Sequence, residues 1–193
     1  MTAVQPRSPS VSLLARAPPP ELARCSLGGV STAGVQILTL RGTELASAEA
    51  FYRSLGRDPT IGPDETVLLA RCGESGIGAV RLVCEQGSLV LRTMQVHPDW
   101  QRRGIGTALL QSLVELVDER ECFCLPWDHL VGFYAASGFA QVEPAVLPSF
   151  LQERLRHSQA AGQPIVGMRR TGRNATGSSV TPGQSDEGAQ EGR

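Results

Sequence analysis

The chain contains 193 residues with a net charge of −1, and its 18 basic residues are all arginine. Such a balance lacks the basic excess that gives affinity for phosphate backbones, so nucleic-acid binding is not expected as the main role. No apolar run approaches the ~18 residues of a membrane-spanning helix, and a hydrophobic fraction of 41% at this length favours one globular domain that does not enter a membrane.

The first 33 residues have the composition of a disordered leader. They hold five prolines and three arginines, with Glu21 as the single acidic side chain, and they cannot supply a hydrophobic core. An organellar transit peptide has the same acid-poor character. We therefore expect a cytoplasmic protein and, as the alternative, a protein of the plastid stroma or another organelle. Residues 172–193 lack apolar periodicity and are predicted to form a disordered tail, which leaves residues 34–171 as the folded domain.

Hydrophobic periodicity predicts a helix flanked by strands in the first half of this domain. Residues 35–40 are typical of a strand, and residues 43–55 of a helix that Thr43 caps. Consecutive strands joined by short turns form an antiparallel meander. Three such strands follow, at residues 66–72, 77–84 and 88–96.

The second half alternates helices with short strands. Its longest helix begins after Gly104, because apolar residues from Ile105 to Val117 recur at helical spacing. The whole order predicts a single-domain α/β fold with a mixed, mainly antiparallel sheet flanked by helices. The shorter elements are strands at residues 122–125, 139–142 and 164–169, and helices at residues 130–136 and 148–160.

The five cysteines include no CxxC pair. Cys122 and Cys124 would lie on one face of a strand, which favours small buried apolar side chains over a disulfide framework or a zinc site. Free thiols are typical of a reducing compartment, and no metal is expected.

The junction between the third meander strand and the longest helix, MQVHPDWQRRGIGT at residues 94–107, is the segment that indicates chemistry. The first N–H groups of a helix point at whatever lies in front of them, and the helix dipole favours an anion there. Gly104 and Gly106 allow close approach to the backbone, and Arg102 and Arg103 add charged donors, so a pyrophosphate fits. A glycine-rich helix start without a ligand is the alternative. A P-loop is excluded because its lysine is missing, and a dinucleotide fingerprint because its third glycine is missing.

These residues resemble a known family, the GNAT superfamily of acetyl-CoA-dependent N-acetyltransferases. Residues 101–106, QRRGIG, match its Q/R-x-x-G-x-G/A pyrophosphate loop. Residues 133–139, FYAASGF, are similar to the later segment in which an aromatic residue and tyrosine precede a glycine and phenylalanine. The element order agrees over roughly residues 34–170, so the resemblance implies a GNAT-like fold.

The resemblance also implies a reaction and a set of site residues. Acetyl-CoA would serve as co-substrate, and a primary amine would attack it directly without an acyl-enzyme. A backbone N–H near Val96 would polarise the thioester carbonyl, and Tyr134, beside the sulfur, would act as general acid. The other cofactor contacts are the pantetheine strand, Met94, Gln95 and Val96, and the pyrophosphate loop, Arg102, Arg103, Gly104, Ile105, Gly106 and Thr107.

Two departures from the family pattern leave a second function open. The strand at residues 88–96 has no carboxylate, so no general base is assigned, and Trp127 stands where many members have a cofactor-contacting asparagine. A non-catalytic acyl-CoA-binding regulatory module is therefore the alternative to an enzyme. The expected acceptor is a small molecule, a protein N-terminus or a lysine, and the expected state is a monomer or homodimer. The candidates considered for the base are Glu85, His97, Asp99, Asp128 and His129.

Overall fold

The computed structural model describes residues 34–172. The expectations for a leader before residue 34 and for the tail beyond residue 172 lie outside these residues. Within them, no helix is long and apolar enough to cross a membrane.

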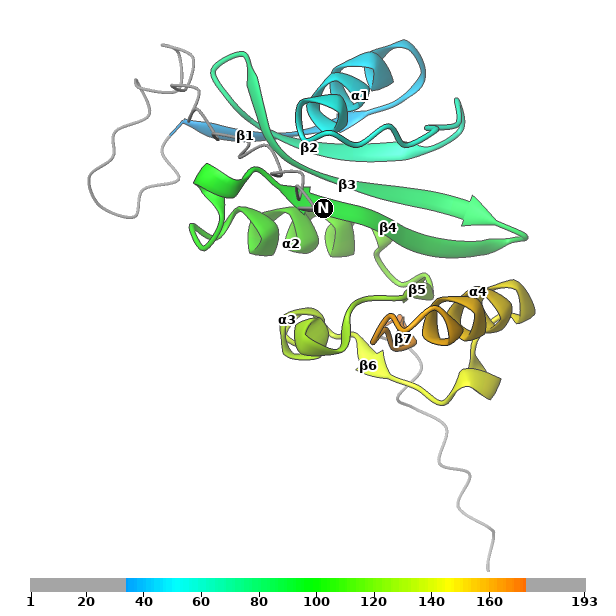
Figure 1. Ribbon diagram of the computed structural model, residues 1–193. Helices are drawn as coiled ribbons and strands as arrows, with labels where there is room; N and C mark the ends of the chain where they lie inside the picture. Colours follow the sequence, from blue (N-terminus) through cyan, green and yellow to red (C-terminus); the bar gives the residue numbers. More distant parts are fainter. Residues whose placement is uncertain (1–33, 173–193) are drawn as a thin grey trace, which may run out of the picture.

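The described chain forms one seven-stranded sheet in the order β1-β2-β3-β4-β5-β7-β6 (Figure 1). Neighbouring strands are antiparallel except β4 and β5, which are parallel. This confirms the expected mixed, mainly antiparallel sheet. The strands are β1 Val35–Leu40, β2 Thr66–Cys72, β3 Ser75–Glu85, β4 Ser88–Val96, β5 Cys122–Cys124, β6 Ala140–Gln141 and β7 Met168–Arg170.

Within residues 34–172, four α-helices flank the sheet, and their bounds follow the predicted periodicity closely. The expected cap of the first helix is wrong, because Thr43 lies inside the short 3-10 helix η2, Gly42–Glu44, and no side chain caps α1. Pro144–Val146 forms a further 3-10 helix, η5, that the sequence patterns did not indicate. The helices are α1 Leu45–Ser54, α2 Ile105–Val117, α3 Val131–Ala135 and α4 Ser149–Ala160.

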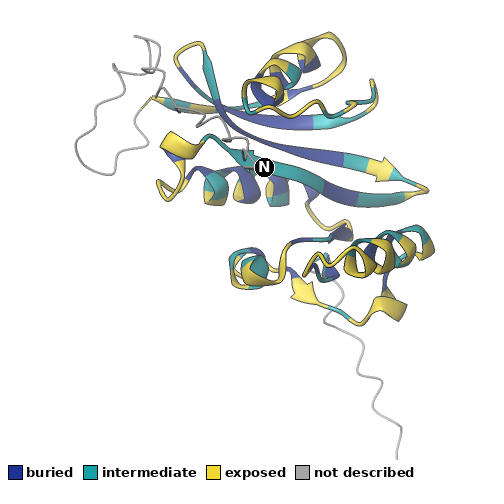
Figure 2. Cartoon of the chain, in the orientation of Figure 1, coloured by how far each residue is buried: buried dark blue, intermediate teal, exposed yellow. Residues whose placement is uncertain are grey.

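The helices divide between the two faces of the sheet. Leu91 of β4 packs with α2 and with Tyr134 of α3, whereas the neighbouring Val90 packs with α4. Val90 pairs with Val83 of β3, and the side chain of Val83 points to the face of the sheet that carries α1. Successive side chains of a strand point to opposite faces, so α2 and α3 cover one face, and α1 and α4 the other. Figure 2 shows burial concentrated in the strands between these layers.

Gly78 of β3 allows α2 to lie directly on the sheet. A Cβ atom at this position would lie 3.0 Å from Ile105 Cγ2 and 3.1 Å from Leu109 Cδ1. Ile105 and Leu109 are both fully buried, so neither side chain has free space to move into.

Gly78→Val is therefore expected to lower the free energy of unfolding by about 1–3 kcal/mol through overpacking. Urea denaturation followed by circular dichroism measures this change. Gly132→Ala in α3 is the matched control, since nothing lies within 4 Å of its added Cβ. An equal loss in both variants would show that the close packing at Gly78 is not the cause.

The cysteines follow the predicted pattern in part. Cys122 and Cys124 are buried free thiols, and Cys84 is free and exposed. Cys72 takes part in a disulfide bond, which the sequence patterns did not indicate.

Candidate active site

A bulge interrupts β4 where it lies opposite Val80 of β3. Arg92 pairs with Arg81 and Gln95 with Ala79, so Thr93 and Met94 together face one residue of β3. Thr93 takes a φ of +49°, a left-handed conformation that costs energy in a β-branched residue. The strand predicted for residues 88–96 is therefore irregular at this point, and the β4 backbone turns locally.

Tyr52 of α1 holds the bulge. Its side chain is completely buried, and its hydroxyl donates a hydrogen bond of 2.7 Å to the carbonyl oxygen of Thr93. Burial raises the pKa of the Tyr52 phenol well above its ordinary value, so the hydroxyl remains a donor at every physiological pH. The contact joins two segments far apart in the chain and stabilises the strained residue.

Tyr52→Phe is expected to lower the free energy of unfolding by about 0.5–1.5 kcal/mol, because the partly buried Thr93 carbonyl loses its donor. Chemical denaturation measures the loss. Tyr134→Phe serves as control, since the Tyr134 hydroxyl has no hydrogen bond to another described residue and should leave stability nearly unchanged. Equal stability of Tyr52→Phe and the wild type would contradict a supporting role for this bond.

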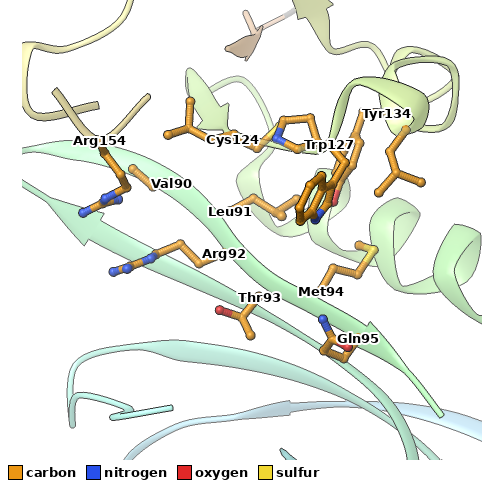
Figure 3. Close-up of a pocket in the computed structure, with 13 residues that line it drawn as sticks. Val90, Leu91, Arg92, Thr93, Met94, Gln95, Cys124, Trp127, Tyr134 and Arg154 are labelled. Carbon is orange, nitrogen blue, oxygen red and sulfur yellow. The ribbon is translucent and has the colours of Figure 1, made fainter. Parts of the chain in front are cut away.

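A cavity of about 310 Å³ opens where β4 and β5 diverge (Figure 3). The parallel pairing of these strands ends at Leu91 and Cys124, so the edge of β4 beyond Leu91 is not covered by β5. Side chains from both faces of the sheet line the cavity, which therefore passes between the strands. The lining residues are those of β4 from Val90 to Gln95, together with Cys124, Leu125, Pro126, Trp127, Leu130, Tyr134 and Arg154.

The loop before α2 has a concave backbone suited to an anion. Arg102 and Gly104 have φ values of +57° and +80°, and no side chain caps the start of α2. The helix behind them has 13 residues. In proteins, backbone N–H groups in such conformations ahead of an uncapped helix are a common arrangement for binding anions. Two side chains hold the loop in place: the Gln101 amide donates to the Val96 carbonyl at 3.2 Å, and the Arg103 guanidinium lies 5.4 Å from the centre of the Trp100 ring.

The two sequence motifs meet at the start of α2. A Cβ atom on Gly106 would lie 3.5 Å from the Phe133 ring and 3.8 Å from a methyl group of Val96. Phe133 in turn lies edge-on against Tyr134, with ring centres 5.1 Å apart. The glycine loop, the end of β4 and the α3 aromatic residues therefore lie next to one another.

Tyr134 of α3 lines the cavity. Its side chain is 5% exposed and packs edge-on against Phe139. Burial, with a smaller contribution from Cys124, raises the pKa of its phenol well above the ordinary value. The phenol is therefore protonated at neutral pH, and it has no hydrogen bond to another described residue that would occupy its proton. Tyr52 has a similarly raised pKa, but its proton is already committed to Thr93.

Of the other predicted cofactor-binding residues, some line the cavity and some lie outside its lining. Met94 and Gln95 line the cavity, whereas Val96 and the loop residues Arg102 to Thr107 lie outside its lining. Trp127, which replaces the asparagine of the family pattern, also lines it. Thr93, Arg92 and Arg154 are lining residues that sequence reasoning missed, because neither a bulge nor a contact between β4 and α4 has a sequence signal.

None of the candidate general bases lines the cavity. Glu85 lies between two arginines: burial opposes its ionisation, but the hydrogen bond from Arg154 and the charge of Arg92 outweigh it and lower the pKa of the Glu85 carboxyl. His97 accepts a hydrogen bond from the Asp99 backbone as a helix cap. Asp128 and His129 are exposed and contact each other.

Comparison with known proteins agrees with this geometry. Residues 63–141 match the family model of the acetyltransferase (GNAT) domain. No curated protein matches the chain significantly. Among solved structures, an acyl-CoA N-acyltransferase from Pseudomonas aeruginosa is 18% identical, with a TM-score of 0.51 over 71% of this chain and 99% of that chain.

Two further similar structures are those of named enzymes. The ribosomal-protein-S18-alanine N-acetyltransferase from Escherichia coli is 17% identical, with a TM-score of 0.52 over 72% of this chain and 97% of that chain. N-acetylglutamate synthase from Neisseria gonorrhoeae, in complex with coenzyme A and N-acetyl-glutamate, is 16% identical, with a TM-score of 0.52 over 70% of this chain and 34% of that chain. At these identities the likeness establishes the fold. The family match identifies an acetyltransferase (GNAT) domain at residues 63–141, and together with the shared fold it supports a member of the GNAT superfamily.

Proposed function

We propose that this acyltransferase is an N-acetyltransferase that moves the acetyl group of acetyl-CoA to a primary amine. The observation that carries the proposal is the arrangement of three features: the uncovered edge of β4 and the phenol of Tyr134 line one cavity, and the loop before the uncapped start of α2 adjoins it through Phe133, which contacts both Gly106 and Tyr134. Each feature matches one part of the co-substrate, namely its amide-containing arm, its pyrophosphate and its sulfur.

The proposal assigns residues of the chain to the pyrophosphate, the pantetheine arm and the thioester of the co-substrate. The backbone from Arg102 to Thr107 would take the pyrophosphate, and the uncovered β4 edge would hydrogen-bond to the pantetheine amides. The bulge favours the N–H of Met94, rather than one near Val96, as the donor to the thioester carbonyl, because Met94 lines the cavity and Val96 does not. The exposed indole of Trp127 would pack against the arm in place of the asparagine.

The reaction follows from these positions. The neutral amine attacks the thioester carbonyl carbon, a C–N bond forms, and the C–S bond breaks. The departing sulfur takes the phenolic proton of Tyr134, which yields CoA as the free thiol, and the new amide loses its surplus proton to water while the phenolate regains one. A raised phenol pKa keeps Tyr134 in the acid form that this step requires.

Deprotonation of the amine is assigned to water, because none of the described carboxylates or histidines lines the cavity. An ordinary alkylamine has a pKa of about 10, so only a small fraction is neutral at pH 7. The rate should therefore rise with pH until the amine is fully deprotonated. The oligomeric state, a monomer or homodimer, stays a prediction. So does the location, which is the cytoplasm or, as the alternative, the plastid stroma or another organelle.

The test is acetyl transfer to a panel of primary amines, with release of free CoA thiol and mass spectrometry of the acetylated product as readouts. The chain contains no lysine, so the enzyme adds no side-chain amine to the assay. Amine-dependent thiol release supports the transferase. Tight binding of CoA in calorimetry without turnover on a broad panel would instead support the non-catalytic acyl-CoA-binding module.

A further inference from the structure

Two arginines lie at the end of the cavity away from Tyr134 (Figure 3). Arg92 of β4 and Arg154 of α4 both line the cavity, and each donates a hydrogen bond of 2.8 Å to a different carboxylate oxygen of Glu85. The two arginine side chains are each 37% exposed, whereas that of Glu85 is 18% exposed. The guanidinium groups are therefore accessible, and the carboxylate between them is largely covered.

The charges at this end do not balance. The lowered pKa of Glu85 keeps it ionised at neutral pH, so two positive groups share one negative group. None of the described residues that line the cavity is acidic. A guanidinium has five N–H donors, and each arginine directs one of them to Glu85, which leaves donors for a further anion.

The position of the pair relates it to the acceptor rather than to CoA. The pyrophosphate loop at the start of α2 and Tyr134 lie on the face covered by α2 and α3. Arg92 lies two residues from Val90 on β4, so its side chain points to the same face as Val90, which packs against α4 on the opposite face. Arg154 belongs to α4 itself. If CoA enters from the first face, the opening at the second face is left for the amine.

Resting on the proposed function, we infer that the amine acceptor carries a carboxylate, and that Arg92 and Arg154 bind it. Arg92 lies on β4 two residues before Met94, with the bulge at Thr93 between them, and its guanidinium extends away from Met94 towards Glu85 near the β3–β4 turn. The carboxylate of the acceptor is therefore separated from its amine by several bonds, as in an ω-amino acid or a peptide whose second residue is acidic.

The experiment compares acceptors that differ only in the carboxylate. One arm pairs 6-aminohexanoate with 6-aminohexanamide, and the other pairs the peptide Ser-Glu-Ala amide with Ser-Gln-Ala amide. We expect kcat/KM to favour the carboxylate member by at least tenfold, in line with a charge-assisted hydrogen bond. Preference in the first arm identifies a small amino acid, and preference in the second identifies an acidic peptide.

Variants distinguish binding of the acceptor carboxylate by the two arginines from a purely structural role in holding α4. Arg92→Gln and Arg154→Gln should each reduce the preference several-fold, and Glu85→Gln should increase it, because both guanidinium groups are released. Arg156→Gln on the exposed side of α4 is the matched control and should keep the wild-type preference. A structural clamp alone would instead lower both members of a pair equally in all three site variants.

The outcomes distinguish this inference from the function on which it rests. Equal use of both members by the wild type overturns the carboxylate site and leaves acetyl transfer standing. An equal fall for both members in the arginine variants also overturns it. Absence of transfer to every acceptor overturns the proposed function, and the inference with it.

Discussion

Replacing Gly106 with valine is expected to lower the affinity for CoA at least 100-fold while the protein stays folded. The Cβ of a residue at this position points between the Phe133 ring and Val96, at ordinary contact distances of 3.5 and 3.8 Å. A first carbon therefore fits, but the two further methyl groups of valine would crowd the Phe133 ring and the end of β4. Gly106 belongs to the segment whose N–H groups are proposed to hold the pyrophosphate, which requires close approach to the backbone.

Isothermal titration calorimetry with CoA measures the effect, and circular dichroism with thermal unfolding checks the fold. Gly106→Ala is the graded control, because its single methyl group makes only ordinary contacts and should weaken binding much less. If the valine variant bound CoA as the wild type does, the assignment of this loop to the pyrophosphate would be wrong.

Tyr134→Phe is expected to lower kcat by about 100-fold or more, with little change in the dissociation constant for CoA. The ring of Tyr134 packs between Phe133 and Phe139, and phenylalanine keeps both edge-on contacts. The hydroxyl has no hydrogen bond to another described residue, so its removal takes away a proton donor without breaking a structural bond. Steady-state kinetics and calorimetry together separate the two effects.

The pH profile provides an independent check on Tyr134. Because burial raises the phenol pKa above its ordinary value of 10.0, the acid form persists beyond that pH. The wild-type kcat/KM should rise with deprotonation of the amine and show no descending limb from this group below pH 10. Unchanged kinetics in Tyr134→Phe would make the residue structural, and a steep fall between pH 7 and 9 in the wild type would argue against a raised pKa.

The local patterns of the sequence determined most of the secondary structure and both motifs. Strands at residues 35–40, 66–72 and 88–96 and the helix after Gly104 follow directly from side-chain alternation and helical spacing. These features depend on neighbours a few residues apart in the chain. The glycines and arginines before α2 are informative for the same reason, since an anion site at a helix start is a local arrangement.

Only the tertiary structure decided the shape of the cavity and the side chains that surround it. The bulge at Thr93 arises from a register mismatch between β3 and β4, and it is held by Tyr52, which is 41 residues away along the chain. Arg154 reaches Glu85 over 69 residues, so no local pattern could associate them. Such contacts depend on how whole elements pack, and that packing forms the site where β4 and β5 diverge.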